Sequence, residues 1–264
     1  MSERITTSKL EAMKAAGEKF VMVTAYDATF ARLVSEAGAE CILVGDSLGM
    51  VLQGHDTTVP VSLEAMVYHT ECVARARPHS LIVSDLPFMT YSSPDVALMA
   101  SMELMQKGAQ MVKLEGGTWL SETIHQLVQR GIPVCAHLGL TPQSVNVFGG
   151  YRVMGRTPKE AKSILADAVE IQDAGASIVL LECVPEDLAA DISSKLDIPV
   201  IGIGAGAGTD AQVLVLHDLL GLTEKPAKFV ENFMASADTV QDAISAFVNA
   251  VKDGSYPQAQ HTYR

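Results

Sequence analysis

The sequence predicts an α/β protein, a (β/α)8 barrel, from three observations. Short apolar runs alternate with amphipathic helical stretches along the chain, a pattern typical of parallel βαβ units. Eight such runs can be counted, and eight parallel strands close a barrel of the TIM type. The chain has 264 residues, an ordinary length for one such barrel. We therefore expect a single domain over residues 1–264, with an open doubly wound sheet as the alternative.

The predicted strands are continuously apolar, which indicates that both faces of each strand are covered. In chain order they are Val21–Ala25, Cys41–Gly45, Ser80–Ser84, Gln110–Glu115, Pro133–His137, Ser177–Glu182, Pro199–Ile203 and, less distinctly, Val213–His217. The stretches with helical periodicity between them are Leu63–Arg77, Asp95–Lys107, Ser121–Arg130, Pro158–Ala174 and Glu186–Leu196. Gly38, Gly108 and Gly175 each follow a helical stretch and precede a strand, where a left-handed cap favours glycine.

The two ends of the chain lie outside the repeating pattern. Ser8 and Glu11 have the spacing of a capping box, which predicts a short N-terminal helix. A last helix is predicted over Thr239–Lys252. The tail Tyr256–Arg264 is expected to be loose or bound to a partner.

The composition excludes two classes of partner. The chain has 19 Lys and Arg against 31 Asp and Glu, and a formal net charge of −12 repels nucleic-acid phosphates. No apolar run approaches a membrane-spanning length, and the N-terminal segment lacks the apolar core of a signal peptide. Cys41, Cys72, Cys135 and Cys183 are widely spaced, as buried free thiols in a reducing compartment are. We expect a cytoplasmic protein that binds neither nucleic acid nor membrane.

Charged residues interrupt the apolar strands at their carboxyl ends and not at their starts. These residues are Asp46, Asp85, Lys113, Glu115, His137, Glu182 and His217. In a closed parallel barrel the carboxyl ends form one rim, where the active sites of this architecture lie. Lys113 and Glu115 are two residues apart, so both point to the same face of their strand. For His217 we favour a capping or packing role.

Carboxylates gathered at one rim predict a bound cation, because their mutual repulsion needs compensation. A ligand set made only of oxygen suits a hard ion such as Mg²⁺ and not zinc. Plainer interpretations exist for single residues. Asp85 can cap the following helix, Lys113 and Glu115 can form a structural ion pair, and His137 can be a core histidine.

Three further patterns bear on the site or the core. The connection over residues 139–157 is long and rich in Gly, Pro and Asn, which predicts a lid. The glycine-rich run Gly202–Gly208 matches a dinucleotide fingerprint, but it follows the seventh strand rather than the first. We therefore interpret it as a tight turn or a close approach of backbone to a ligand. Met99, Met102 and Met105 recur at helical spacing, which predicts core packing.

Five long motifs carry a family resemblance. They are VTAYD (Val23–Asp27), VGDSLGMVLQGHDTT (Val44–Thr58), DLPFMTY (Asp85–Tyr91), KLEGG (Lys113–Gly117) and HLGLTPQSVNVFGGY (His137–Tyr151). In this order they resemble the ketopantoate hydroxymethyltransferase family, and the resemblance extends from about Val21 to Tyr256 and Pro257.

The resemblance implies a (β/α)8 barrel of the phosphoenolpyruvate mutase and isocitrate lyase group, assembled as a homodecamer of two pentamer rings. It also implies a reaction. The one-carbon unit of 5,10-methylenetetrahydrofolate is transferred to 3-methyl-2-oxobutanoate, giving 2-dehydropantoate for pantothenate synthesis. One Mg²⁺ ion per subunit would stabilise the enolate of the oxo acid.

The motifs also imply roles for single residues. Asp46 and Asp85 resemble the Mg²⁺-site residues, in contact with the substrate as well, and Glu115 completes the shell of the metal. Ser47 and Lys113 resemble the groups that hold the carboxylate and oxo oxygens of the oxo acid.

Two residues are implied for the chemistry at C3 of the substrate. Glu182, in LLECVP (Leu180–Pro185), matches the catalytic base, and His137 matches a histidine of the substrate pocket.

Two other functions stay open. A lyase or mutase of the isocitrate lyase type shares the barrel and the metal, but its loop cysteine has no counterpart at a matching place here. A non-catalytic binding or assembly protein is the other, and the intact set of charged rim residues argues against it.

Overall fold

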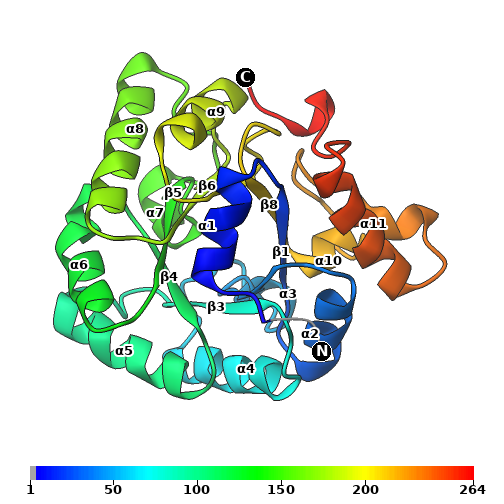
Figure 1. The fold of residues 1–264 in the computed structure, drawn as a ribbon, viewed down its shortest axis with the longest axis horizontal. Helices are drawn as coiled ribbons and strands as arrows, with labels where there is room; N and C mark the ends of the chain where they lie inside the picture. The colour runs from blue at the N-terminus through cyan, green and yellow to red at the C-terminus, as the bar shows by residue number, and fades with distance from the viewer. Residues whose placement is uncertain (1–3) are drawn as a thin grey trace.

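The computed structural model describes residues 4–264, which contain a closed barrel of parallel strands (Figure 1). The strands are β1 (Phe20–Thr24), β2 (Cys41–Val44), β3 (Leu81–Asp85), β4 (Met111–Glu115), β5 (Val134–Gly139), β6 (Ile178–Glu182), β7 (Val200–Ile203) and β8 (Ala211–Leu214). Each strand pairs with the next, and β8 closes the barrel against β1. The predicted barrel is confirmed, and an open sheet is excluded. Residues 1–3 of the predicted domain 1–264 lie outside the described part of the chain.

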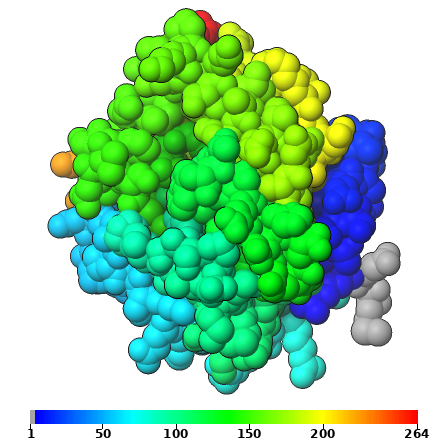
Figure 2. Space-filling view, turned by 90° about the vertical axis from the view of Figure 1, so that its left-hand side faces the viewer, coloured from blue at the N-terminus to red at the C-terminus, as the bar shows by residue number. Residues whose placement is uncertain are grey.

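Helices surround the barrel and account for the apolar composition of its strands. They are α1 (Thr7–Ala15), α2 (Ala28–Glu36), α3 (Leu48–Val51), α4 (Leu63–Arg75), α5 (Pro94–Gln106), α6 (Ser121–Gln129), α7 (Val145–Phe148), α8 (Pro158–Asp173), α9 (Glu186–Lys195), α10 (Leu216–Leu219) and α11 (Val240–Lys252). Short 3₁₀ turns lie at Thr118–Leu120, Pro142–Ser144, Phe233–Ser236 and Ala259–His261. Figure 2 faces the side of α5, α6 and α8, where helical side chains cover the barrel wall. Every residue of β1, β3 and β4 is buried.

Helix α1 packs against the amino-terminal end of the barrel (Figure 1). It buries Leu10 and Met13, and Lys14 Nζ lies 2.7 Å from a carboxylate oxygen of Asp210, which directly precedes β8. The opposite, carboxyl-terminal end is thereby left as the open end of the barrel.

The predicted capping box at the start of α1 is wrong. The helix begins one residue before Ser8, and Thr6 is its N-cap, with extended backbone and a side chain that accepts from Lys9 N. Ser8 is therefore already inside the first helical turn, where its hydroxyl has no capping position to occupy.

The eighth strand is displaced from its prediction. It covers Ala211–Leu214 rather than Val213–His217, and His217 lies in α10 instead of closing a strand. The ring of His217 packs 5.9 Å from that of Tyr26, which agrees with the packing role favoured for it.

The C-terminal tail is packed on its own barrel, so the prediction of a loose tail is wrong. Tyr256, His261 and Thr262 are buried, and Tyr256 Oη donates a 2.6 Å hydrogen bond to the carbonyl of Phe229. Figure 1 shows the C-terminus beside α9.

The methionines of α5 also correct a prediction. Met99 and Met102 have exposed fractions of 59% and 40%, and only Met105 packs against the core. The three methionines are spaced as expected for a helix, but Met99 and Met102 lie on the outer face of α5.

Over the described residues, no helix combines the length and apolar character needed to cross a membrane.

The glycine-rich run after β7 permits close packing. A Cβ on Gly206 would lie 2.6 Å from Glu186 Cβ, and one on Gly208 would lie 2.6 Å from Ala190 Cβ. These two glycines therefore let the loop pack closely against α9.

Candidate active site

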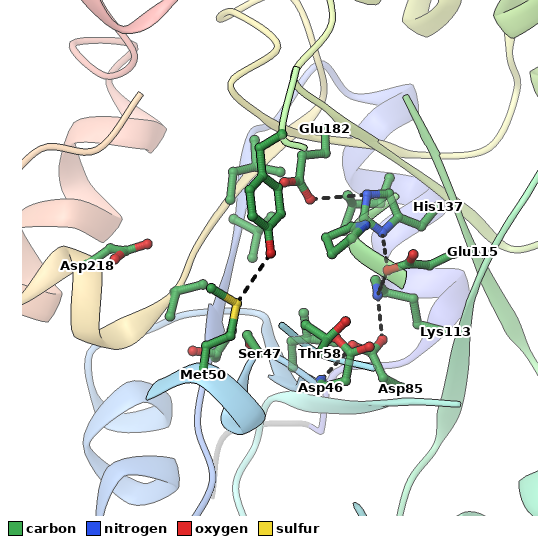
Figure 3. A pocket seen from close by; sticks show the side chains of 18 of the residues that line it. Asp46, Ser47, Met50, Thr58, Asp85, Lys113, Glu115, His137, Glu182 and Asp218 are labelled. Carbon is green, nitrogen blue, oxygen red and sulfur yellow. Dashed lines mark hydrogen bonds and ion pairs between the residues drawn. The ribbon is translucent and has the colours of Figure 1, made fainter. Parts of the chain in front are cut away.

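A cavity of about 170 Å³ opens at the carboxyl-terminal rim of the barrel (Figure 3). The sequence-predicted residues that line it are Asp46, Ser47, Asp85, Lys113, Glu115, His137 and Glu182. They come from five consecutive strands or from the residues that directly follow them. Parallel strands bring their carboxyl ends together, which is why residues far apart in sequence meet here. His217 does not line this cavity, whereas its neighbour Asp218 does.

The strand register pairs the charged side chains. Asp85 is the register partner of Lys113, and Lys113 Nζ donates to Asp85 Oδ1 at 2.6 Å. The other oxygen of Asp85 accepts from the backbone N–H of Asp46 at 2.9 Å. Burial alone would lower the pKa of Lys113, but the adjacent carboxylates of Asp85 and Glu115 raise it above its usual value. Lys113 is therefore a fixed positive charge at the base of the cavity.

His137 lies between two carboxylates. Glu115 is its register partner, with Oε1 3.4 Å from Nδ1, and Glu182 Oε2 lies 3.3 Å from Nε2. Burial alone would lower the pKa of His137, but Glu115 and Glu182 raise it to about 9. Burial likewise would raise the pKa of Glu115, but His137 and Lys113 lower it. The charges thus alternate in sign along the rim.

Gln143 joins two of the carboxylates and was not predicted. Its backbone N–H donates to Glu115 Oε2 at 2.9 Å, and its side-chain amide donates to Asp46 Oδ2 at 2.8 Å. Its amide oxygen accepts from the hydroxyl of Tyr91 at 2.5 Å. Gln143 lies in the long connection after β5, so that loop reaches into the site. In the sequence, Gln143 is a single amide within the motif HLGLTPQSVNVFGGY, and nothing in that motif indicates these partners.

Other residues of the cavity were also missed. Thr58 is buried, and its hydroxyl has no hydrogen-bond partner among residues 4–264. Tyr26 does not line the cavity itself, but its Oη lies 2.9 Å from Oγ of the lining residue Ser47, and either group can donate. Tyr151 Oη approaches Met50 Sδ at 3.6 Å across the mouth of the cavity. Each lies within a quoted motif, but only the folded chain shows which side chains turn inward.

The donor set fits a hard cation. Burial raises the pKa of Asp46 well above its usual value, and the nearby carboxylates of Asp85 and Glu115 raise it further. Glu115 Oε1 is buried and makes no hydrogen bond within residues 4–264, although His137 Nδ1 lies 3.4 Å from it. A cation at these oxygens would relieve the crowded negative charge. Lys113 compensates only part of that charge.

The protein does not enclose such an ion by itself. In the part of the chain that is described, no three His, Cys, Asp or Glu side chains are grouped closely enough to hold a metal. Mg²⁺ is commonly bound by one or two carboxylates, with water and substrate oxygens completing its shell. The open cavity beside Asp46 and Asp85 suits that mode of binding.

The chain resembles known proteins over nearly its whole length. The family model described as ketopantoate hydroxymethyltransferase matches residues 4–259. A 3-methyl-2-oxobutanoate hydroxymethyltransferase 2 of Pseudomonas aeruginosa (strain UCBPP-PA14) is 56% identical over 261 residues, covering 98% of both chains. A protein of Burkholderia multivorans (strain ATCC 17616 / 249), named 3-methyl-2-oxobutanoate hydroxymethyltransferase, is 55% identical over 260 residues, covering 98% of this chain and 96% of that one.

Solved structures support the fold group. A 2,3-dimethylmalate lyase, described as a PEP mutase/isocitrate lyase superfamily member, superposes with a TM-score of 0.60 at 16% identity, covering 98% of this chain and 97% of that one. A phosphonopyruvate hydrolase in complex with oxalate and Mg²⁺ gives a TM-score of 0.61 at 12% identity, with 97% and 93% covered. At these identities the likeness concerns the fold alone, and it agrees with the closed barrel of parallel strands.

Proposed function

Because this chain belongs to the ketopantoate hydroxymethyltransferase family of enzymes, we propose that it transfers a hydroxymethyl group from 5,10-methylenetetrahydrofolate to 3-methyl-2-oxobutanoate. The product is 2-dehydropantoate, a precursor of pantothenate. The observation that carries the proposal is the gathering of all seven predicted site residues in one rim cavity. The free cysteines favour a cytoplasmic location.

The proposed reaction joins the one-carbon unit of the donor to C3 of the oxo acid. C3 of the oxo acid loses a proton and forms a bond to the methylene carbon of the donor. Both bonds from that carbon to the nitrogens of the carrier break, water supplies the hydroxyl oxygen, and tetrahydrofolate leaves. The enzyme therefore needs a base near C3 and positive charge near the oxo and carboxylate oxygens.

Asp46 and Asp85, with Glu115 completing the shell, are the residues that would hold Mg²⁺. When bound, the ion supplies Lewis-acid stabilisation of the negative charge that develops on the substrate oxygens. Each carboxylate is already oriented by the protein, Asp85 by Lys113 and the Asp46 backbone, and Asp46 by Gln143. Such outer partners fix the ligands in place before the ion and the substrate bind.

Ser47 and Lys113 are proposed to bind the oxo acid. Lys113 is buried and charged, so it directs positive charge at the substrate oxygens in a site of low polarity. The hydroxyl of Ser47 is hydrogen-bonded to Tyr26, and when Tyr26 donates in that bond, Ser47 can donate to a substrate carboxylate. Together they would orient C3 away from the charged base of the cavity.

Glu182 is proposed to remove the C3 proton. It lies at the end of β6, its side chain is 17% exposed, and it faces the cavity from the side opposite Asp46 (Figure 3). His137 stands 3.3 Å from it and holds the carboxylate in position. Pro142 and Tyr151, from the connection after β5, also line the cavity and would exclude water during the transfer.

The test is product analysis with purified protein. With Mg²⁺, 3-methyl-2-oxobutanoate and 5,10-methylenetetrahydrofolate, we expect 2-dehydropantoate, detected by mass spectrometry, and none when the folate is omitted. A lyase or mutase would instead cleave 2-oxo or 2-hydroxy acids without folate. No turnover with the complete mixture would indicate a non-catalytic protein.

A further inference from the structure

A second cavity, of about 270 Å³, shares part of its wall with the first. Tyr151, Glu182 and Phe229 line both cavities, so the two meet beside the proposed base. The remaining wall of the second cavity includes Arg152 and Tyr263. No step of the proposed reaction at the oxo acid uses this space.

The aromatic wall of this cavity is built into the fold. Gly204, at φ +60°, leaves room for two rings, because a Cβ there would lie 2.7 Å from Phe229 and 3.1 Å from Tyr263. The carbonyl of Tyr263 accepts from Glu186 N at 2.9 Å, at the start of α9, and Lys228 Nζ donates to the carbonyl of Thr262. The packed tail thus places the penultimate residue of the chain, Tyr263, beside the active site.

Positively charged side chains lie around this cavity, although the chain as a whole carries a net negative charge. Arg152 is one of the lining residues, with its guanidinium carbon 5.8 Å from the centre of the Phe148 ring, and Lys228 Nζ lies 5.4 Å from the centre of the Tyr263 ring. Arg152 is only partly neutralised, because the Glu160 carboxylate stands 3.6 Å away and the Arg152 side chain is about half exposed to solvent. An aromatic slot with cations at its edge suits a flat heteroaromatic ring that carries an anionic tail.

A third cavity nearby, of about 390 Å³, does not have this character. It shares only Glu115 with the first cavity, and its wall includes the acidic residues Glu160 and Asp167 beside Trp119. Among the described residues, no Lys or Arg lines it. An anionic tail would be repelled there.

We propose that the cavity formed by Tyr151, Phe229 and Tyr263 binds the pterin ring of the one-carbon donor, with its anionic tail toward Arg152 and Lys228. This inference rests on the proposed function and adds the site of the second substrate. The pterin would be stacked on fixed rings next to Glu182, so the methylene carbon enters the first cavity beside the C3 atom that Glu182 deprotonates. The tail of the chain then has a function, as one wall of the donor site.

The test compares variants in two assays, each with the full-length protein and Mg²⁺. One assay gives the KM for 5,10-methylenetetrahydrofolate together with the Kd of tetrahydrofolate by calorimetry. The other gives exchange of the C3 hydrogen of 3-methyl-2-oxobutanoate in D₂O, which needs no folate. Tyr263→Ala should raise the KM and Kd by roughly 5- to 150-fold, as expected for the loss of one stacked ring. It should keep native C3 exchange, which also shows that it is folded.

Matched variants make the result specific. Tyr263→Phe keeps the ring and should retain native folate affinity, and Tyr68→Ala, on the exposed surface of α4, should change neither assay. Native folate affinity in Tyr263→Ala would overturn the inference, as would a loss of affinity in Trp119→Ala instead, which would place the donor in the acidic cavity. Failure of the native protein to exchange C3 hydrogen or to form product would contradict the proposed function itself.

Discussion

At the scale of single residues, the site depends on one amide that spans it. Gln143 contacts Asp46, Glu115 and Tyr91, which are 97, 28 and 52 residues away in the sequence. It also donates to the carbonyl of Leu86 at 3.0 Å, so its orientation is fixed by several partners at once. Removing the amide leaves a buried carboxylate and a buried phenol without their partners, which is costly for a polar group.

Gln143→Met should therefore weaken metal binding while keeping the size of the side chain. A residue that orients a metal ligand typically contributes about 10- to 100-fold to metal affinity. We expect the Mg²⁺ concentration for half-maximal activity to rise by roughly that factor. Gln126→Met, on the outer helix α6, is the matched control. An unchanged Mg²⁺ requirement in Gln143→Met would show that the amide does not orient the ligands.

The carboxylates themselves give a second prediction. Excess EDTA should abolish product formation, and added Mg²⁺ should restore it, because the proposed enolate needs the cation. Asp46→Asn and Asp85→Asn keep the shape of the side chains but remove charge, so both should bind Mg²⁺ more weakly by calorimetry. Full activity in excess EDTA would be incompatible with a metal site at this rim.

At the scale of secondary structure, register explains how much of the site the sequence could predict. Continuous apolar runs located the strands, and a parallel barrel must bring their charged ends to one rim. Register then pairs Asp85 with Lys113 and Glu115 with His137. The position of Gln143 could not be predicted, because an irregular loop has no periodicity that relates its sequence to its path. The short β8 was misplaced for a similar reason, since the apolar residues continue past it into α10.

The start of α1 shows the limit of local patterns and gives a third prediction. Thr6 and Ser8 both have hydroxyls suited to an N-cap, and only the fold distinguishes them. Thr6→Ala should lower the free energy of unfolding by about 1 kcal/mol, whereas the control Ser8→Ala should change it little. Urea unfolding at equal subunit concentrations measures both. A larger loss for Ser8→Ala would mean that the helix starts where the sequence motif predicted.

At the scale of the whole molecule, the outer surface carries apolar side chains that a lone barrel would leave in water. Phe88, Met89, Met99 and Met102 have exposed fractions of 42%, 58%, 59% and 40%, and they lie on α5 or just before it. Several exposed large apolar side chains on one segment of the chain are typical of an association site. The spacing of Met99 and Met102 predicted that they are buried, and an interface between subunits would bury them.

The family resemblance implies a homodecamer, and we expect that assembly. One chain has a mass of 28.1 kDa, so sedimentation at micromolar concentration should give one species of about ten times that mass. Assembly buries apolar surface, so Met99→Glu with Met102→Glu should shift the protein toward smaller species if α5 lies in an interface. A stable monomer of the native chain at micromolar concentration would refute the assembly.

The central claim is that Glu182 removes the C3 proton of a 2-oxo acid bound at the metal-supported rim. It is tested most directly by hydrogen exchange in D₂O with Mg²⁺ and 3-methyl-2-oxobutanoate, without folate. The native enzyme should replace the C3 hydrogen with deuterium, and chelation of the metal should stop the exchange. Glu182→Gln keeps the shape of the side chain but cannot accept a proton, so exchange should fall by about 10²- to 10⁴-fold. Exchange at the native rate in Glu182→Gln would contradict the claim and make His137 the next candidate for the base.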